Sequence, residues 1–186
     1  MASKEGKINK YKILVVVDMQ NDFISGSLPA EEGDKIIPRI VEKMQDPKYY
    51  KVILTKDTHF KDYLDTEEGK KLPIEHCIRD TEGWELIDEI KELVENDQNK
   101  YIVLEKMTPG SNILFTWLNA NNNMIDYVEF VGVCTDICVL SNVVMAKTAL
   151  LKSTVVVDAR GCAGTTVDNH NKALDLMKNN LMVDVY

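Results

Sequence analysis

Short runs of apolar residues alternate along this chain with segments whose apolar residues recur at helical spacing. Residues 13–17 are apolar at every position, which indicates a strand buried on both faces of a sheet. Residues 34–44 place apolar side chains three and four positions apart, as one face of a helix requires. Similar runs predict strands at 52–55, 101–104, 127–133, 154–157 and 182–185, and similar spacings predict helices at 84–94, 112–118, 136–150 and 167–178.

This alternation of strand and helix predicts the fold class. Repeated β–α units favour a parallel sheet whose crossover helices cover both faces. We expect an α/β fold: a three-layer, doubly wound, Rossmann-like and mostly parallel six-stranded sheet with helices on both faces. The 186 residues contain neither an internal repeat nor a Gly/Ser/Pro linker. We therefore expect a single domain over residues 1–186, with residues 1–11 as a flexible N-terminal extension.

One long segment, residues 57–83, breaks the alternation. It is charged and rich in turn-forming residues, and it starts directly after a predicted strand. Long connections inside a compact domain are usually functional or mobile. Because ligands of open α/β sheets bind beyond the carboxyl ends of the strands, this segment is well placed to border a site.

Charge and composition narrow the classes of partner. The chain has 22 Lys and Arg against 30 Asp and Glu, a formal charge of −8, which opposes a broad nucleic-acid or anionic membrane surface. Its apolar runs are too short to span a bilayer, and residues 1–12 lack the apolar core of a secretory signal. We expect a cytoplasmic protein that acts on a small molecule, without a nucleic-acid or membrane partner.

Three chemically capable side chains follow three different predicted strands. Asp18, Lys106 and Cys138 each lie at or just beyond a strand end, so a parallel sheet brings them to one edge. Taken singly, the carboxylate suits a turn cap, the lysine suits solvent, and the cysteine suits the core as a small apolar residue. Together they suit nucleophilic acyl transfer, in which the carboxylate takes the thiol proton and the ammonium stabilises the anion.

A second group of side chains has the composition of a metal site. Asp57 and His59 are two residues apart, so in an extended segment they point the same way, and His76 follows in the same connection. One carboxylate and two imidazoles suit catalytic Zn²⁺ or Fe²⁺, and Glu67 or Glu68 offers a further oxygen. The alternative is a pair of solvated surface histidines beside an aspartate.

The four cysteines, by contrast, do not form a metal or disulfide framework. Cys77, Cys134, Cys138 and Cys162 contain no Cys-x-x-Cys pair. A chain of this size that is not secreted also has no need of disulfide bonds.

Five segments, in this order along the chain, carry a family resemblance. They are Val-Asp-Met-Gln-Asn-Asp-Phe at 17–23, Lys-Asp-Thr-His at 56–59, Glu-His-Cys at 75–77, Lys106 with Ser111, and Gly-Val-Cys-Thr-Asp-Ile-Cys-Val at 132–139. From about residue 12 onward the chain resembles the isochorismatase-like cysteine hydrolases, and within them the nicotinamidases.

The resemblance implies a role for each matched residue. It implies a catalytic triad in which Asp18 is the general base, Lys106 its partner, and Cys138 the nucleophile that forms a thioester. It also implies a homo-oligomer, a cis peptide bond between Val133 and Cys134, and a divalent metal cofactor, with Zn²⁺ first and Fe²⁺ or Mn²⁺ as alternatives. The remaining implied sites are an oxyanion hole from the backbone N–H groups of Cys134 and Cys138, a ring-packing position at Phe23, and metal ligands Asp57, His59 and His76.

The chain departs from the nicotinamidase pattern at one position. The aromatic residue expected three places before the later metal histidine is Pro73 here. Our leading prediction is hydrolysis of nicotinamide to nicotinate and ammonia. The alternatives are hydrolysis of another small amide, carbamoyl compound or ureide; hydrolysis of isochorismate itself, which suits a thiol nucleophile less well; and a non-catalytic binding protein on the same fold, which the intact triad opposes.

Overall fold

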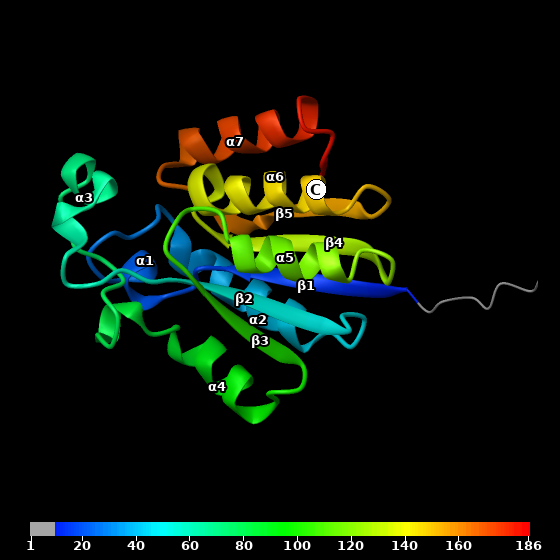
Figure 1. Ribbon diagram of the computed structural model, residues 1–186, viewed down its shortest axis with the longest axis horizontal. Coiled ribbons are helices and arrows are strands. Elements are labelled where there is room, and N and C mark those ends of the chain that lie inside the picture. The colour runs from blue at the N-terminus through cyan, green and yellow to red at the C-terminus, as the bar shows by residue number, and fades with distance from the viewer. Residues whose placement is uncertain (1–9) are drawn as a thin grey trace, which may run out of the picture.

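Within residues 10–186, which the computed structural model describes, the protein forms a six-stranded sheet of order β3-β2-β1-β4-β5-β6 (Figure 1). Each pair of neighbouring strands runs parallel. The strands are β1 (Tyr11–Val17), β2 (Lys51–Asp57), β3 (Tyr101–Lys106), β4 (Ile125–Val133), β5 (Thr154–Ala163) and β6 (Asp184–Val185). The helices are α1 (Asn21–Ile24), α2 (Ile37–Gln45), α3 (Glu67–Lys71), α4 (Asp88–Asn96), α5 (Asn112–Ala120), α6 (Leu140–Ala149) and α7 (Val167–Asn179).

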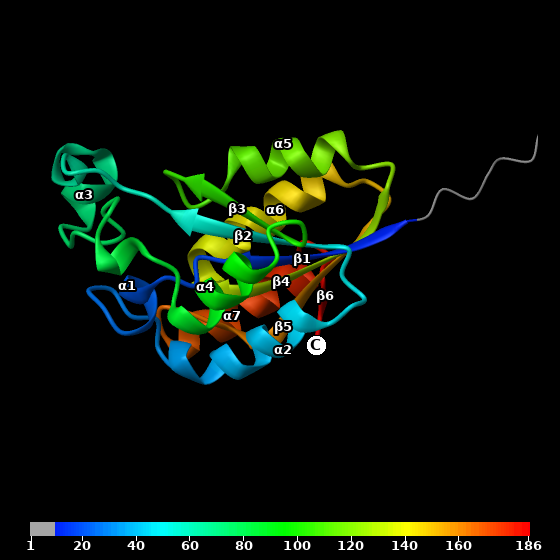
Figure 2. The same cartoon turned by 90° about the horizontal axis from the view of Figure 1, so that it is seen from below.

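Helices cover both faces of the sheet, which confirms the predicted fold class. Alternate residues of β1 point to opposite faces, so Val15 belongs to a core cluster that contains residues of α5, α6 and α7, whereas Val16 belongs to a cluster that contains residues of α2 and α4. Figure 2 shows α5 and α2 on opposite sides of the sheet. The continuous apolar run of β1 is therefore explained by burial on both faces. In the described part of the chain, no helix has the length and apolar character needed to cross a membrane.

The strand order creates a crevice between β1 and β4. β2 and β3 follow β1 toward one edge of the sheet, and β4 then lies on the other side of β1. At such a switch point the following segments diverge to opposite faces, which leaves room for a ligand at the carboxyl ends of the strands. Asp18 follows β1 and Cys134 follows β4, so both lie at this crevice. In Figure 1, α1 and α3 lie beyond the same end of the sheet.

The helix predicted over residues 84–94 is partly wrong, because it begins only at Asp88. Trp84 ends a separate single turn of 3₁₀ helix that the Thr81 side chain caps. The backbone then extends, and Leu86 pairs antiparallel with Gln20. The side-chain amide of Gln20 also donates to the Trp84 carbonyl at 2.9 Å, so that carbonyl is satisfied outside a helix.

Other predicted boundaries also change. β5 continues to Ala163, six residues past its predicted end, and β6 is confined to Asp184–Val185. Residues 57–83 contain α3, and His59 forms a parallel bridge with Ile78, so the segment is tied back to the sheet edge. Most of the expected N-terminal extension, residues 1–9, lies outside the described residues, and Tyr11 already belongs to β1.

A buried polar cluster anchors α2 and the C-terminal strand to the sheet. Glu129 in the middle of β4 is fully buried and accepts hydrogen bonds from Lys43 of α2 and from three tyrosines, Tyr49, Tyr127 and Tyr186. Burial alone raises the pKa of Glu129, but these hydrogen bonds outweigh it and lower the pKa to about 2. The carboxylate is therefore charged and fully satisfied despite lying in the core.

The Glu129→Gln variant is expected to lose the part of the stability that depends on this charge. The folded-state pKa lies below the ordinary glutamate value of 4.5, so the contribution is present above that value and disappears as the pH falls toward 2. The shift corresponds to about 3 kcal/mol. Lys43 keeps Asp158 at 2.8 Å, so the variant retains a charge partner there. Urea unfolding at pH 7 and pH 3.5 should show that the difference in free energy of unfolding between wild type and variant is smaller at the lower pH. A difference that does not change with pH would contradict this.

Candidate active site

A cavity of about 260 Å³ opens at the crevice beyond β1 and β4. Its wall is mostly apolar and includes Phe23, Leu72 and Ile137. The thiol of Cys138 and the imidazole of His76 are among the few polar groups that line it. An apolar cavity with a few convergent polar groups is the usual form of a small-molecule site.

Asp18 occupies the turn that directly follows β1. Its backbone has φ +50°, a left-handed conformation that aspartate tolerates better than most residues. The side chain is fully buried, and Oδ1 accepts a 2.7 Å hydrogen bond from the Thr55 hydroxyl. Oδ2 lies 2.7 Å from Nζ of Lys106. The carboxylate is therefore fixed in position by β2 and β3 at once.

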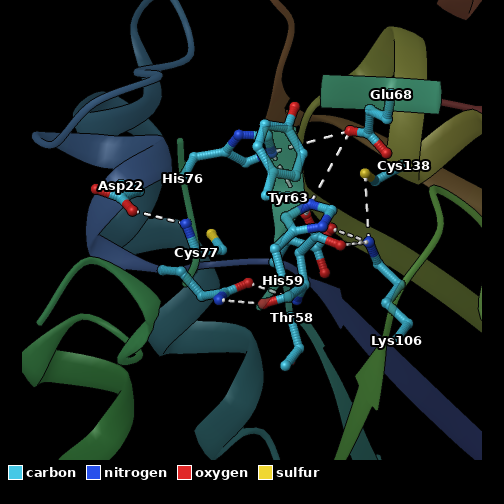
Figure 3. A network of polar contacts seen from close by, with 12 residues as sticks. Asp22, Thr58, His59, Tyr63, Glu68, His76, Cys77, Lys106 and Cys138 are labelled. Atoms are coloured by element: carbon cyan, nitrogen blue, oxygen red, sulfur yellow. Dashed lines mark hydrogen bonds and ion pairs between the residues drawn. The ribbon is translucent and has the colours of Figure 1, made fainter. Parts of the chain in front are cut away.

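Lys106 ends β3 and is surrounded by the acidic and thiol groups of the cavity. In the sheet register it lies opposite Asp57, the last residue of β2. Its buried Nζ lies 2.7 Å from Asp18 and 3.1 Å from Oδ1 of Asp57. It also lies 3.5 Å from Sγ of Cys138, a contact that Figure 3 draws as a dashed line. The structure thus brings together Asp18, Lys106 and Cys138, as the strand ends predicted.

The pKa shifts of these three groups have a common cause in burial and mutual charge. Burial raises the pKa of Asp18, although Lys106 opposes the effect. Burial would lower the pKa of Lys106, but the charges of Asp18, Cys138 and Asp57 outweigh it and raise that pKa well above the ordinary value. Burial and the Asp18 charge raise the pKa of Cys138. The resting site is therefore a thiol beside an ammonium–carboxylate pair, and a carboxylate of raised pKa is a better base.

Cys138 lies in a wide turn between β4 and α6. This π-helical turn, Thr135–Val139, follows a cis peptide bond between Val133 and Cys134, which confirms that prediction. The carbonyl of Cys134 accepts hydrogen bonds of 3.1 Å from the N–H groups of both Ile137 and Val139, the two neighbours of Cys138. The sequence predicted a continuous helix from residue 136. Instead, the looser turn presents Cys138 at the cavity wall before α6 begins.

Beside the thiol, Asp57, His59 and His76 form a cluster suited to a metal ion. One possible ligand atom from each lies within 4.8 Å of the others. Nδ1 of His76 lies 2.8 Å from the carbonyl of Ile74, so a proton on Nδ1 leaves Nε2 available. Nε2 of His59 is buried, lies 3.1 Å from Oδ2 of Asp57, and lacks a well-aligned hydrogen-bond partner among residues 10–186. These residues fit a divalent cation.

Glu68 completes the surroundings of this cluster. Its Oε1 lies 4.0 Å from Nε2 of His59 and 4.0 Å from Nε2 of His76, as the dashed lines in Figure 3 indicate. Glu68 also lines the cavity, and more than a third of its side chain is exposed. It is therefore within reach of the cluster without being locked in place, whereas Glu67 of the same helix forms an exposed ion pair with Lys70.

The chain matches one protein family over nearly its whole length. The isochorismatase domain model matches residues 12–185, nearly the full chain. The chain belongs to the isochorismatase family.

Named relatives of this isochorismatase-family chain agree with that assignment. It is 29% identical to the nicotinamidase of Saccharomyces cerevisiae, over 79% of this chain and 86% of the yeast protein. Its fold is similar to the crystal structure of the nicotinamidase/pyrazinamidase of Bacillus subtilis, with a TM-score of 0.83, 28% identity and coverage of 94% and 98%. It is also similar to the pyrazinamidase of Pyrococcus horikoshii in complex with zinc, with a TM-score of 0.77, 25% identity and coverage of 95% and 98%.

The ring-packing side of the cavity differs from the family pattern as the sequence indicated. Phe23 lines the cavity, and its ring centroid lies 5.6 Å from that of His76. Pro73 is exposed, and the neighbouring residue that reaches the cavity is Leu72. In this isochorismatase-family member the aliphatic side chain of Leu72 therefore lines the part of the cavity where the nicotinamidase pattern leads one to expect an aromatic ring.

Two further residues, which the pattern of strand ends did not predict, hold residues of the site in place through hydrogen bonds. The buried amide of Gln20 accepts from the Asp57 N–H at 2.7 Å and donates to the Asp57 carbonyl at 2.8 Å. The Asp136 carboxylate accepts from both the N–H and the hydroxyl of Thr165, a cavity residue that follows β5. Gln20 lies in segment 17–23, which carries part of the family resemblance, but its role depends on β2 lying beside it, and local sequence pattern does not reveal that.

Proposed function

We propose that this isochorismatase-family protein is a metal-dependent cysteine amidohydrolase that converts nicotinamide and water to nicotinate and ammonia. The observation that carries the proposal is the Cys138 thiol, 3.5 Å from a Lys106 ammonium that in turn lies 2.7 Å from Asp18. The nicotinamidases among its relatives supply the substrate class. The mostly apolar cavity suits a neutral amide with a flat ring.

In the proposed reaction, Cys138 attacks the amide carbon. Asp18 accepts the thiol proton as Sγ bonds to that carbon, and Lys106 stabilises the sulfur and carboxylate charges. The backbone N–H groups of Cys134 and Cys138 hold the oxyanion of the tetrahedral intermediate. Asp18 then returns the proton to the leaving nitrogen, the C–N bond breaks, and ammonia leaves a thioester. A water molecule then gives a proton to Asp18 and attacks the thioester carbon. The C–S bond breaks, nicotinate is released, and Asp18 returns the proton to sulfur, which restores the thiol.

We assign Asp57, His59 and His76 to the divalent cation. An ion held there would supply Lewis-acid chemistry to the site. Zinc is the first candidate, because the donor set is one carboxylate and two imidazoles and because a pyrazinamidase relative was crystallised with zinc. Fe²⁺ and Mn²⁺ are the alternatives that the same donors accept.

Replacement of a proposed ligand should abolish tight metal binding. We expect His76→Ala to weaken zinc binding by more than about 100-fold, since even outer partners of a ligand are worth 10- to 100-fold. Equilibrium dialysis with metal analysis measures this directly, without enzyme activity. His170→Ala is the matched control, because His170 bonds the Thr135 hydroxyl and lies outside the cluster. Equal affinity in both variants would remove His76 from the ligand set.

Ammonia release from nicotinamide by the zinc-loaded protein tests the proposed function. A parallel panel of small aliphatic amides, carbamoyl compounds and ureides tests the second candidate, which the Leu72 wall and the exposed Pro73 favour. Turnover of nicotinamide with the highest kcat/KM of the panel is the expected result. Turnover of another amide alone would overturn nicotinamide as the substrate but would leave the cysteine amidohydrolase mechanism in place.

The expected cytoplasmic location and homo-oligomeric state stay predictions.

A further inference from the structure

Asn142 is a buried amide in α6 that the proposed reaction does not use. Its residue is fully buried, and its side chain makes three hydrogen bonds to backbone groups. Nδ2 donates to the carbonyl of Cys138 at 2.8 Å and to the carbonyl of Pro109 at 3.1 Å. Oδ1 accepts from the N–H of Ser111 at 2.9 Å. The amide thus uses both of its N–H groups and its carbonyl.

These partners fix the orientation of the amide. Two of the surrounding backbone groups are carbonyls, which only accept, and one is an N–H, which only donates. The opposite orientation of Asn142 would put its oxygen against two carbonyls and its N–H₂ against an N–H. Asn142 is therefore matched to this position as a donor toward Cys138 and Pro109 and an acceptor toward Ser111.

The three bonds join the two segments that carry the thiol and the ammonium. Pro109 and Ser111 belong to the loop that begins directly after Lys106, and the Ser111 hydroxyl caps α5 by accepting from Leu114. Cys138 belongs to the turn before α6. Asn142 is the side chain through which the backbone of the nucleophile is bonded to the loop of the lysine.

The surroundings of Asn142 argue that this link is specific. Its neighbours on the helix, Val139, Val143 and Ala146, all belong to the hydrophobic core, where an apolar residue would be expected. A polar amide costs free energy at such a position unless all of its groups are bonded. All of its groups are bonded here, and loss of the amide would remove these partners from the buried backbone groups of Cys138 and Ser111 and from the carbonyl of Pro109.

We propose that Asn142 is a positioning residue that holds Cys138 and Lys106 at their reactive separation. This inference rests on the proposed roles of these two residues as nucleophile and charge partner. Small displacements of reacting groups have large kinetic costs, so the link is expected to influence the chemical step more than substrate binding.

Two variants separate the parts of the link. Asn142→Leu fills similar space and removes all three bonds. Asn142→Asp keeps an acceptor for Ser111 but places an oxygen against the carbonyls of Cys138 and Pro109. The control is Val143→Ala, which creates a cavity at the adjacent, fully buried position of the same helix and leaves the amide intact.

Four quantities are measured for each folded variant: the rate constant for alkylation of Cys138 by iodoacetamide, kcat and KM for nicotinamide, and Tm. For both Asn142 variants we expect alkylation and kcat to fall together by about 10- to 100-fold, with KM changed by less than about threefold. Val143→Ala should lower Tm and leave alkylation and kcat near the wild-type values.

The outcomes distinguish this inference from the proposed function, because alkylation needs no amide substrate. Slower alkylation in the Asn142 variants supports the inference even if wild type does not hydrolyse nicotinamide. Alkylation at the wild-type rate in a folded Asn142 variant would overturn it, as would an equal decrease in Val143→Ala, since the amide would then act through stability alone. If Asn142→Leu does not fold, Asn142→Asp decides the question.

Discussion

The Cys138→Ala variant is expected to lose amide hydrolysis by about 10⁴-fold or more in kcat, because it removes the proposed nucleophile. Its thiol lines the cavity and lies 3.5 Å from Nζ of Lys106. Steady-state ammonia release, with detection extended by high enzyme concentration, measures the loss. Zinc affinity should be unchanged, because Asp57, His59 and His76 remain in place.

Cys162→Ala is the matched control for that result. Cys162 is buried in the hydrophobic core, where burial raises the pKa of its thiol and Sγ contacts the Phe130 carbonyl at 3.9 Å. We expect a lower Tm with kcat within about threefold of wild type, because a core truncation costs stability and not chemistry. An active Cys138→Ala variant would overturn the thioester mechanism, and an inactive Cys162→Ala variant that is folded would show that the assay responds to packing.

The convergence of the triad could be predicted from the sequence for a simple reason. Carboxyl ends of parallel strands meet at one edge of a sheet, so residues that follow different strands become neighbours regardless of their distance along the chain. Asp18 and Lys106 are 88 positions apart by their numbering, yet their charged atoms lie 2.7 Å apart. Only the strand pattern was needed to predict this.

The metal cluster could be predicted in part. Asp57 and His59 share a face because they are two apart in extended chain. No spacing rule places His76, whose position depends on how residues 57–83 fold back. The structure gives two ties that do this: the parallel bridge between His59 and Ile78, and the 2.7 Å hydrogen bond from the Cys77 N–H to Asp22. Both join segments distant in sequence, so local pattern cannot reveal them.

The residues that support the site were the least predictable. Asn142 lies in a helix of apolar neighbours and bonds to Pro109 and Ser111, more than 30 positions earlier. Leu72 lines the cavity, whereas the adjacent Pro73 is exposed, and the motif alone does not specify which of the two reaches the cavity. Such roles arise from tertiary contacts, whereas the chemical groups themselves follow from strand ends.

The Asp18→Asn variant is expected to lower kcat by about 10³-fold, within the range that a positioned general base contributes. Asparagine keeps the size of the side chain and an oxygen that can accept from Thr55, but it cannot take the thiol proton. Lys106 would retain the Asp57 carboxylate at 3.1 Å, so the ammonium is not left unpaired and the variant should fold. Pre-steady-state ammonia release with saturating nicotinamide measures the chemical step, and KM should change little because Asp18 is not among the residues that line the cavity.

Thr55→Val provides the graded comparison for Asp18→Asn. It removes the 2.7 Å hydrogen bond to Oδ1 and leaves the carboxylate and its 2.7 Å contact with Lys106. A base that is present but less firmly oriented should lose about tenfold in kcat, much less than a base that is absent. We therefore expect kcat to decrease in the order wild type, Thr55→Val, Asp18→Asn. This order distinguishes a role of Asp18 in proton transfer from a role in packing. If the two variants lost equal activity at equal Tm, Asp18 would act by holding the cavity together, and another group would have to take the thiol proton.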